Sequence, residues 1–297
     1  MAKAVPMNAV QPAAATARKS KRGVVIREHV IPRIVLLLMC GLFLLPFYWM
    51  LTIALKSNQE LGNFPATLYP HDFQWGNFKA ATEVFPFWRF LGNTTTVTAL
   101  TVVGSAISNP FIAYGFSRIE WPGRDKIFYF MLATVFIPYP ALIIALFDIY
   151  AQLKWVNTFL PLVVPFFFGN AFWIFLMRQF FMQISTEVSD AARLDGANDF
   201  RILFQIILPQ AIPAVMAVSL FAALHAWNDF LGPLLYLQHE SKYTLAVGLT
   251  FFQSASQYDI QYNLLMAAAA LVIVPVVALF LIFQRNFVGG VSLGSIK

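Results

Sequence analysis

Six stretches without a single Asp, Glu, Lys or Arg constrain this chain more than any other feature. They run over residues 34–55, 90–117, 127–147, 155–177, 202–228 and 260–284. Each has 21 to 28 residues, and a helix needs about 20 apolar residues to cross the hydrocarbon core of a bilayer. Of the 297 residues, 59% are hydrophobic and 11% are charged, against about 45–50% and 25% in soluble domains. The sequence therefore predicts an all-α polytopic membrane protein with six transmembrane helices, and it excludes an ordinary soluble enzyme.

The boundaries of the spans follow from these stretches and their flanks. We expect one transmembrane domain over 33–284, with helices at about 33–55, 91–117, 127–148, 158–180, 213–237 and 263–284. The fifth helix should begin near Pro213, because the residues before it have the pattern of a surface helix, and it should continue through Asp229. A shorter uncharged run at 243–258 is interrupted by small and polar residues. We predict an extracytoplasmic loop there and leave open whether it re-enters the membrane.

Basic residues are distributed unevenly between the two sides of the predicted membrane. The tail at 1–32 is rich in Ala, Pro, Lys and Arg, cannot build a core and is predicted to be a disordered basic tail. Lys and Arg number 15 in the N-terminal segment up to Arg33, the loops at 118–126 and 178–213, and the tail at 285–297. The other three loops hold 5. By the positive-inside rule, both tails lie in the cytoplasm of a multi-pass cell-membrane protein.

Residue types that carry catalysis or hold metal ions are scarce. The four histidines are scattered without a familiar metal-ligand spacing, and the single cysteine, Cys40, lies within an apolar run. The chain has no Gly-Lys dipeptide and hence no Walker A phosphate loop. We therefore expect no enzyme activity, metal or cofactor in this chain, and if it works with ATP, another chain hydrolyses it.

The loop between the fourth and fifth spans has the most specific pattern. It reads Glu187-Val-Ser-Asp-Ala-Ala-Arg-Leu-Asp-Gly196 and later Leu208-Pro209. Ser185 or Thr186 can cap a first helix, and Gly196 can supply its left-handed end. A second helix should then start at Asn198 or Asp199 and stop at Pro209. The pattern predicts a helix, a turn and a second helix on the cytoplasmic side.

One face of the first helix in this loop carries Val188, Ala191, Ala192 and Asp195. Small side chains on this face would let the helix enter a groove of a partner protein. On pattern alone, an ordinary amphipathic helix at the membrane surface is an equal alternative. A DNA-binding helix-turn-helix is excluded, because the 178–213 loop has a net charge of −1 and would repel phosphates.

The loop resembles the EAA loop of binding-protein-dependent ABC importer permeases, whose spacing is EAA-x3-G-x9-I-x-L-P. Asp190 stands where the family has Glu, and six positions match: Ala191, Ala192, Gly196, Ile206, Leu208 and Pro209. Four further stretches resemble the carbohydrate branch, the maltose- and glycerol-phosphate-type second permease: Pro86-Phe-Trp-Arg-Phe-Leu, Ala113-Tyr-Gly-Phe-Ser-Arg, Trp227-Asn-Asp-Phe-Leu and Gln284-Arg-Asn-Phe-Val-Gly-Gly. The resemblance extends from about residue 50 to the end.

This resemblance implies a subunit of an ATP-driven importer for a sugar or oligosaccharide. The chain would form the translocation path with a second permease subunit, while two cytoplasmic ATP-binding subunits bind ATP and Mg²⁺. An extracytoplasmic solute-binding protein would contact the loop at about 238–262, and the end of the chain at Ser292–Lys297 would extend toward the ATPases. The residues expected to couple the chain to the ATPases are Glu187, Asp190, Ala191, Ala192, Asp195, Gly196, Leu208 and Pro209.

Polar residues inside the fifth span are the second candidate site. His225 and Asp229 are four residues apart, hence on one helical face, and Asn228 lies beside them. Ionisable groups inside a membrane are costly and mark functional sites by default, so these three form a candidate translocation path. Hydrogen bonding between helices is the alternative. The rival function is a secondary transporter or channel without ATPase partners, for which inverted repeats and several intramembrane carboxylates would be expected.

Overall fold

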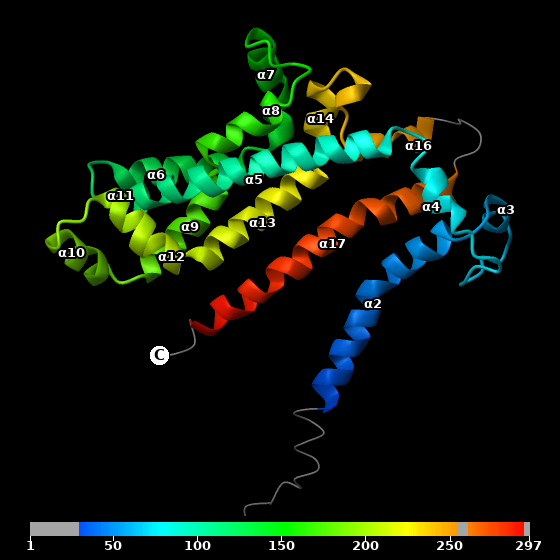
Figure 1. The fold of residues 1–297 in the computed structure, drawn as a ribbon, viewed down its shortest axis with the longest axis horizontal. Helices are drawn as coiled ribbons and strands as arrows, with labels where there is room; N and C mark the ends of the chain where they lie inside the picture. Colours follow the sequence, from blue (N-terminus) through cyan, green and yellow to red (C-terminus); the bar gives the residue numbers. More distant parts are fainter. Residues whose placement is uncertain (1–29, 255–260, 294–297) are drawn as a thin grey trace, which may run out of the picture. The chain divides into compact units, whose positions relative to one another are not determined.

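The computed structural model describes residues 30–254 and 261–293, and within them all regular secondary structure is helical, as predicted (Figure 1). The chain divides into two compact units, Met1–Trp49 and Met50–Lys297. Three predicted segments fall outside the described residues in whole or part. These are the N-terminal tail up to residue 29, residues 255–260 of the extracytoplasmic loop, and residues 294–297 of the C-terminal tail.

Within the described ranges, four helical segments are long and apolar enough to cross a membrane. They are α2 (Ile31–Ala54), α5 (Phe87–Ser117), Leu160–Gln183, and Tyr262–Gln284 of α17 (Tyr262–Leu293). The number rises to six if each of two bent pairs is one span. The pairs are Arg124–Phe136 with α7 (Tyr139–Gln152), bent by 101°, and Asp199–Gln210 with α13 (Ile212–Asn228), bent by 80°. Several shorter helices connect them: α3 (Asn58–Leu61), α4 (Gly76–Ala81), α10 (Thr186–Leu194), α14 (Leu231–Tyr236), α15 (Leu245–Gly248) and α16 (Phe251–Ser254).

The third predicted span is two helices rather than one. α6 (Arg124–Ala133) continues into the 3-10 turn η2 (Thr134–Phe136), and α7 begins at Tyr139. Between them Ile137 and Pro138 are extended, with ψ of 115° and 132°. A proline disfavours helical dihedrals in the residue before it, so the chain turns sharply at Pro138.

The fifth predicted span is also interrupted, at the position where its acidic residue lies. α13 ends at Asn228, Asp229 has ψ of 118°, and α14 begins at Leu231. Pro233 has no N–H to donate to the carbonyl of Asp229, so a continuous helix would lack a hydrogen bond here. Asp229 therefore lies in a break between two helices rather than on the face of one.

The fourth predicted span is built from short pieces packed against α5. α8 (Leu160–Val163) and the 3-10 turn η3 (Val164–Phe168) precede Gly169, whose φ is +90°, and α9 (Ala171–Gln183) follows. A Cβ on Gly104 of α5 would lie 2.6 Å from the ring of Phe167, and Ser108 donates to the carbonyl of Phe166 at 2.9 Å. The small residues of α5 thus allow the close approach that a small-xxx-small pattern favours.

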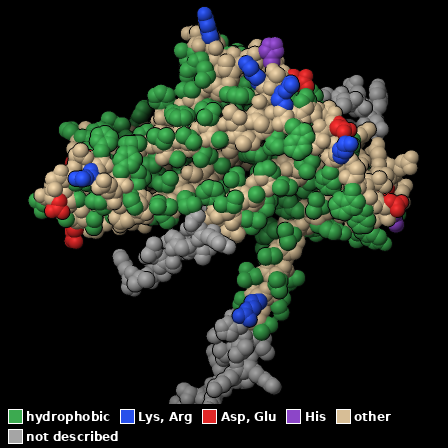
Figure 2. Space-filling model, viewed as in Figure 1, with side chains coloured by type: hydrophobic (Ala, Val, Ile, Leu, Met, Phe, Trp, Pro, Cys, Tyr) green, Lys and Arg blue, Asp and Glu red, His purple; other side chains and the backbone are tan. Residues whose placement is uncertain are grey.

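Side chains divide the larger unit into an apolar middle and two charged ends. One buried cluster joins α5, α9, α13 and the Asp199–Gln210 segment, and another joins α4, the start of α5, α15 and α17. Figure 2 shows hydrophobic side chains over the middle of the face, whereas charged side chains lie at the α10–α11 end, along the upper edge near α7 and α14, and at the end opposite α10. This distribution suits a body that exposes its middle to lipid.

The loop at 243–258 is fastened to the beginning of α5. The Asn93 amide donates to the carbonyls of Ser241 and Tyr243, both at 2.9 Å. The Thr94 hydroxyl accepts the backbone N–H of Leu245 at 2.9 Å. Leu245 and Val247 are buried, so the described part of this loop is packed against the protein.

Candidate functional site

α10 is defined at both ends by local hydrogen bonds of its own sequence. The Ser185 hydroxyl accepts the N–H of Glu187 at 3.2 Å, so the predicted cap is confirmed. At the other end the N–H of Gly196 bonds to the carbonyl of Arg193 at 3.0 Å, and that of Ala197 to the carbonyl of Ala192 at 2.9 Å. These two bonds, with φ of +82° at Gly196, form a Schellman motif. The predicted left-handed glycine is confirmed.

The exposed face of α10 differs from the predicted one by about a quarter turn. Ser189 is buried, and Ala192 packs against the core cluster that joins α5, α9 and α13. Glu187, Asp190, Ala191 and Leu194 share the opposite, exposed face. Leu194 is 91% exposed, the larger exposed fraction of the two exposed large apolar side chains of α10, Val188 and Leu194. Ala192 supports the helix from inside, whereas Val188, Ala191 and Asp195 are exposed as expected.

The second helix of the loop does not stop at Pro209. α11 (Asp199–Ile202), capped by the Asn198 side chain on the N–H of Arg201 at 2.9 Å, leads into a π-helical turn at Leu203–Ile207. α12 (Leu208–Gln210) follows and contains Pro209 near its start, where a missing N–H is tolerated. The chain turns at Ala211 instead. Leu208 packs against the core and Pro209 is exposed, and neither lies on the exposed face of α10.

A chain of polar contacts connects this loop to the transmembrane helix α5. The Tyr114 hydroxyl of α5 donates to Asp199 Oδ1 at 2.9 Å. The same oxygen accepts Arg193 Nη2 at 3.1 Å, and Arg193 Nη1 donates to Asp190 Oδ1 at 3.1 Å. The hydrogen bond with Asp199 is the main cause that raises the pKa of Arg193 above its ordinary value. The Asp199 carboxylate of α11 therefore joins α5, through Tyr114, to α10, through Arg193.

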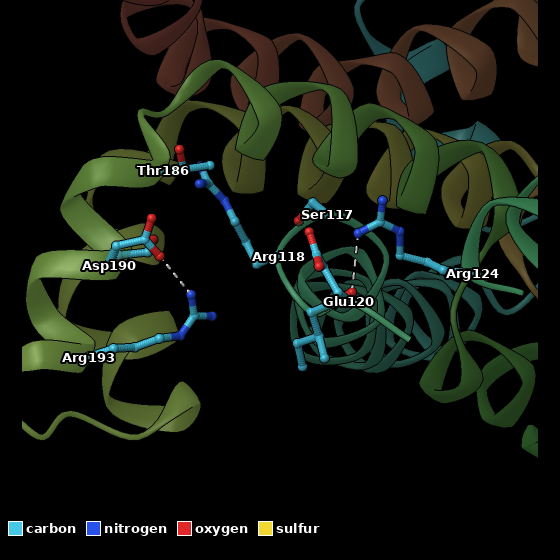
Figure 3. Close-up of a pocket in the computed structure, with 9 residues that line it drawn as sticks. Ser117, Arg118, Glu120, Arg124, Thr186, Asp190 and Arg193 are labelled. Atoms are coloured by element: carbon cyan, nitrogen blue, oxygen red, sulfur yellow. Dashed lines mark hydrogen bonds and ion pairs between the residues drawn. The ribbon is translucent and has the colours of Figure 1, made fainter. Parts of the chain in front are cut away.

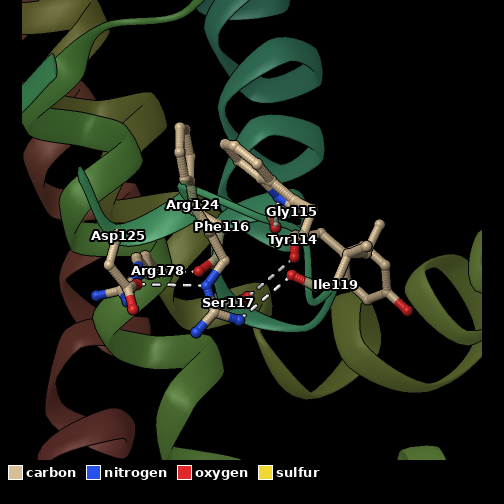
Figure 4. Close-up of polar contacts among 9 residues, drawn as sticks. Tyr114, Gly115, Phe116, Ser117, Ile119, Arg124, Asp125 and Arg178 are labelled. Atoms are coloured by element: carbon tan, nitrogen blue, oxygen red, sulfur yellow. Dashed lines mark hydrogen bonds and ion pairs between the residues drawn. The ribbon is translucent and has the colours of Figure 1, made fainter. Parts of the chain in front are cut away.

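Basic side chains also hold the carboxyl end of α5 to α9. Arg118, which follows α5 and whose pKa burial lowers, donates to the carbonyls of Phe181 and Ile184 just before α10. Arg178 of α9 donates to the carbonyl of Phe116 at 3.0 Å and to Asp125 at 3.2 Å (Figure 4). Cations suit the carboxyl ends of helices, where backbone carbonyls lack partners.

A polar cavity of about 550 Å³ separates α10 from the connection between α5 and α6. In Figure 3 Thr186, Asp190 and Arg193 line it from the α10 side, while Ser117, Glu120 and Arg124 line it from the other. Arg118 extends across the cavity toward Thr186. α10 thus contacts the rest of the chain through its buried face and a few polar side chains, and its outer face is left uncovered.

A second cavity, of about 450 Å³, surrounds the break in the fifth span. His225 and Asp229 both line it, so the structure brings together two of the three residues predicted there. Asp229 Oδ1 accepts the N–H of Gly232 at 3.1 Å, which caps α14. Asn228 is exposed, donates to the carbonyl of Leu224 at 2.8 Å, and is not among the residues lining the cavity.

Several residues at these sites were not singled out from the sequence. The signal for Leu194 is in the sequence: it is a large apolar residue in a mostly polar helix, and it lies outside the face that carries the small residues. Tyr114 lies in the stretch Ala113-Tyr-Gly-Phe-Ser-Arg, but its partner Asp199 is 85 residues away. Tyr139 and Tyr150 line the second cavity, and only the sharp turn at Pro138 brings them there. In the described ranges no group of three or more His, Cys, Asp or Glu residues could hold a metal ion.

Comparisons with known proteins agree on one family. A family model described as "binding-protein-dependent transport system inner membrane component" matches residues 111–292. The diacetylchitobiose uptake system permease protein of Streptomyces coelicolor is 31% identical over 91% of this chain and 90% of its own length. The arabinooligosaccharides transport system permease protein of Halalkalibacterium halodurans is 32% identical, over 73% of this chain and 76% of its own.

A solved structure has the same fold. The crystal structure of a bacterial ABC transporter involved in import of the acidic polysaccharide alginate contains a chain that superposes with a TM-score of 0.76. Its sequence is 25% identical, and the match covers 90% of this chain and 99% of that one. Because the family match extends over more than half of its length, this chain belongs to the inner membrane components of binding-protein-dependent transport systems, the multi-pass permease subunits of ABC importers.

Proposed function

We propose that this permease imports an oligosaccharide and that α10 is the element through which ATP hydrolysis drives it. The observation that carries the proposal is the exposed face of α10, from Glu187 to Leu194, on a helix whose other face is anchored to α5 and α9. The substrate class is supported by relatives whose names assign them arabinooligosaccharides and diacetylchitobiose.

Coupling follows from how α10 is held. A partner ATPase would bury Leu194 and Ala191, and Glu187 and Asp190 would supply polar contacts at the rim of that interface. Displacement of α10 would reach α5 through Arg193, Asp199 and Tyr114, because rigid contacts transmit movement between packed elements. Asp195 and Gly196 would fix the end of the helix, and Leu208 and Pro209 would connect the loop to α13.

The translocation path in this chain would pass the break at Asp229. His225 and Asp229 line the cavity there, and polar groups at membrane depth usually face an aqueous pathway. Asn228 would belong to the same path through its exposed side chain, on a surface that a second permease could cover. Asp229 also caps α14, so a structural role is combined with the proposed one.

The full assembly would contain this chain, a second permease, two ATP-binding subunits and an extracytoplasmic solute-binding protein in the bilayer. ATP and Mg²⁺ would be bound by the ATPases, since this chain has no phosphate loop. Both termini would lie in the cytoplasm. The described part of the 238–262 loop, fastened to α5 by Asn93 and Thr94, would present a fixed surface to the binding protein.

Reconstitution tests this function directly. Proteoliposomes with the purified permease pair, the ATPases and the binding protein should take up radiolabelled arabinotriose, diacetylchitobiose or trehalose only with ATP inside. Uptake of the same sugars by the permease pair alone, driven by an ion gradient, would favour a secondary transporter instead. The ATPases should also copurify with the tagged permease.

A further inference from the structure

The cavity at the break of the fifth span combines features that individual motifs do not reveal. Elements from four parts of the chain form its walls: α5 at Val97, α7, the segment from Pro161 to Asn170, and α13 with the start of α14. Its volume of about 450 Å³ falls within the range of about 300–1,000 Å³ that is typical of small-molecule sites. Most of its lining is aromatic or aliphatic, with a few polar side chains converging on it.

The side chains of Asn170 and Asp229 each have one part fixed by the backbone and another part left for a ligand. The Asn170 Oδ1 accepts the N–H groups of Phe172 and Trp173, which caps α9, while no described residue accepts a hydrogen bond from its Nδ2. The Asp229 carboxylate accepts the backbone N–H of Gly232, with that of Leu231 nearby. A carboxylate can accept about four hydrogen bonds, so acceptor capacity remains.

Close packing fixes the position of the Asp229 carboxylate. A Cβ on Gly232 would lie 2.5 Å from Asp229 Oδ2 and 3.0 Å from Leu162 Cδ2, so only glycine allows this approach. His225 is held by edge contacts with Phe166 and Trp173, at centroid distances of 5.4 and 6.1 Å. The imidazole has ring contacts but no hydrogen bond within the described part of the chain. These groups are preorganised and still have capacity to bind.

Aromatic side chains also line this cavity, among them Tyr139 and Tyr150 of α7, and Tyr236 and Trp155 pack behind them. Tyr150 stacks on Trp155 at 5.7 Å and meets the edge of Tyr236 at 5.2 Å, and the hydroxyls of Tyr139 and Tyr236 lie 3.2 Å apart. Rigid aromatic rings together with hydrogen-bonding groups in one cavity are complementary to a pyranose or furanose ring, which has apolar C–H faces and polar hydroxyl edges. A lipid chain would satisfy the aromatic wall but leave the polar groups unpaired, at a cost.

We propose that this cavity is a subsite for one uncharged sugar ring of the transported oligosaccharide, and the proposal rests on the proposed function. The ring would stack against the aromatic wall, and its hydroxyls would pair with Asn170, His225 and Asp229. Among the residues that the structure describes, none of those lining the cavity is Lys or Arg. A sugar carboxylate would therefore enter without a cationic partner and beside Asp229, which is strongly unfavourable in a low-dielectric site. This chain would thus contribute to substrate selection, in addition to the binding protein.

Protection of a cysteine in the cavity wall tests for occupancy. In a Cys40→Ala background, Leu146→Cys places a thiol in the cavity and Gln152→Cys places one on the exposed end of the same helix. The full complex in nanodiscs, with binding protein and ATP, is treated with a small maleimide with and without arabinotriose, diacetylchitobiose or trehalose. We expect the transported sugar to slow labelling at position 146 at least fivefold and to leave position 152 unchanged. An alginate trisaccharide should not protect.

Transport kinetics of two variants provide the second measurement. Asp229→Asn keeps a side-chain oxygen that can cap α14, and His225→Ala leaves the helix intact. Each should lower kcat/KM for uptake about tenfold, the usual effect of one lost hydrogen bond to a ligand. The affinity of the binding protein and the amount of copurified ATPase should not change. His71→Ala, an exposed histidine outside the cavity, is the matched control.

The outcomes separate this inference from the proposed function. If wild type takes up none of the sugars with ATP, the oligosaccharide function itself is wrong. If wild type transports a sugar but position 146 is labelled equally with and without it, or both variants keep wild-type kinetics, the subsite is wrong and the permease function stands. Equal protection by the alginate trisaccharide would refute the selection for uncharged rings.

Discussion

At the scale of single residues, Gly196 contributes through its backbone conformation alone. Its φ is +82°, and a Cβ at this position would meet no atom within 4 Å. We expect Gly196→Ala to destabilise the loop by about 1–2 kcal/mol, because a left-handed conformation strains any residue with a Cβ. Gly115→Ala is the control, since Gly115 lies inside α5 with equal space and ordinary helical dihedrals. It should be neutral or slightly stabilising. Thermal unfolding of the purified permease compares them, and equal midpoints would refute the strain.

The sequence predicted the conformation of those residues whose interactions are local. The Ser185 cap, the Asn198 cap and the left-handed Gly196 follow from chemistry within a few positions, and all three are present. The sequence could not predict that Ala192 faces the core, because its pattern of small residues would allow either of two faces of α10 to be buried. Only the cluster formed by α5, α9 and α13 decides which face is buried.

At the scale of elements, the two neighbouring alanines of α10 separate docking from folding. Ala191 is exposed, so Ala191→Trp should insert and unfold like wild type but reduce copurified ATPase at least tenfold. Ala192 packs against the core, so Ala192→Trp should lower stability by about 1–3 kcal/mol through overpacking. Lys126→Trp, exposed on α6, controls for an added surface tryptophan. Full ATPase retention by Ala191→Trp would exclude α10 as the docking element.

The contact between α5 and α11 gives a second prediction at this scale. Tyr114→Phe removes the hydrogen bond to Asp199 at 2.9 Å and leaves Arg193 on the same carboxylate. We expect a stability loss of about 0.5–1.5 kcal/mol and a lower ratio of sugar transported to ATP hydrolysed, with normal ATPase copurification. Tyr129→Phe on the exposed face of α6 should change neither quantity. An unchanged ratio in Tyr114→Phe would mean that this bond only stabilises the fold.

The sequence also predicted some elements better than others. α2, α5 and α17 correspond to uncharged stretches with one proline each, and they are continuous helices. The third and fifth predicted spans also contain prolines, and they are interrupted at residues with extended dihedrals: Ile137, directly before Pro138, and Asp229, four residues before Pro233. Composition cannot distinguish these cases, because a proline inside a helix kinks or ends it according to the packing around it. The cavity at Asp229 exists because of these two interruptions.

At the scale of the whole molecule, the loops rich in Lys and Arg, at 118–126 and 178–213, lie at a different end of the larger unit from the loops that have few basic residues. Contacts join the 118–126 loop to the 178–213 loop, as between Asp125 and Arg178, and join Asn93 to the 241–245 segment. The count assigns the first set, with its excess of Lys and Arg, to the cytoplasm. This assignment predicts the accessibility of cysteines introduced into a Cys40→Ala chain.

In intact cells, Asn63→Cys and Glu240→Cys should react with an impermeant maleimide. Leu194→Cys, at a position 91% exposed, should react only after the membrane is opened, because the basic-residue count assigns its loop to the cytoplasmic side. Ser20→Cys and Ser295→Cys should behave like position 194 if both termini are cytoplasmic. Labelling after permeabilisation controls for thiols that are simply unreactive. Labelling of position 194 from outside would reverse the orientation and remove α10 from the reach of any cytoplasmic ATPase. Labelling of position 295 alone from outside would leave α10 in place and require an odd number of spans.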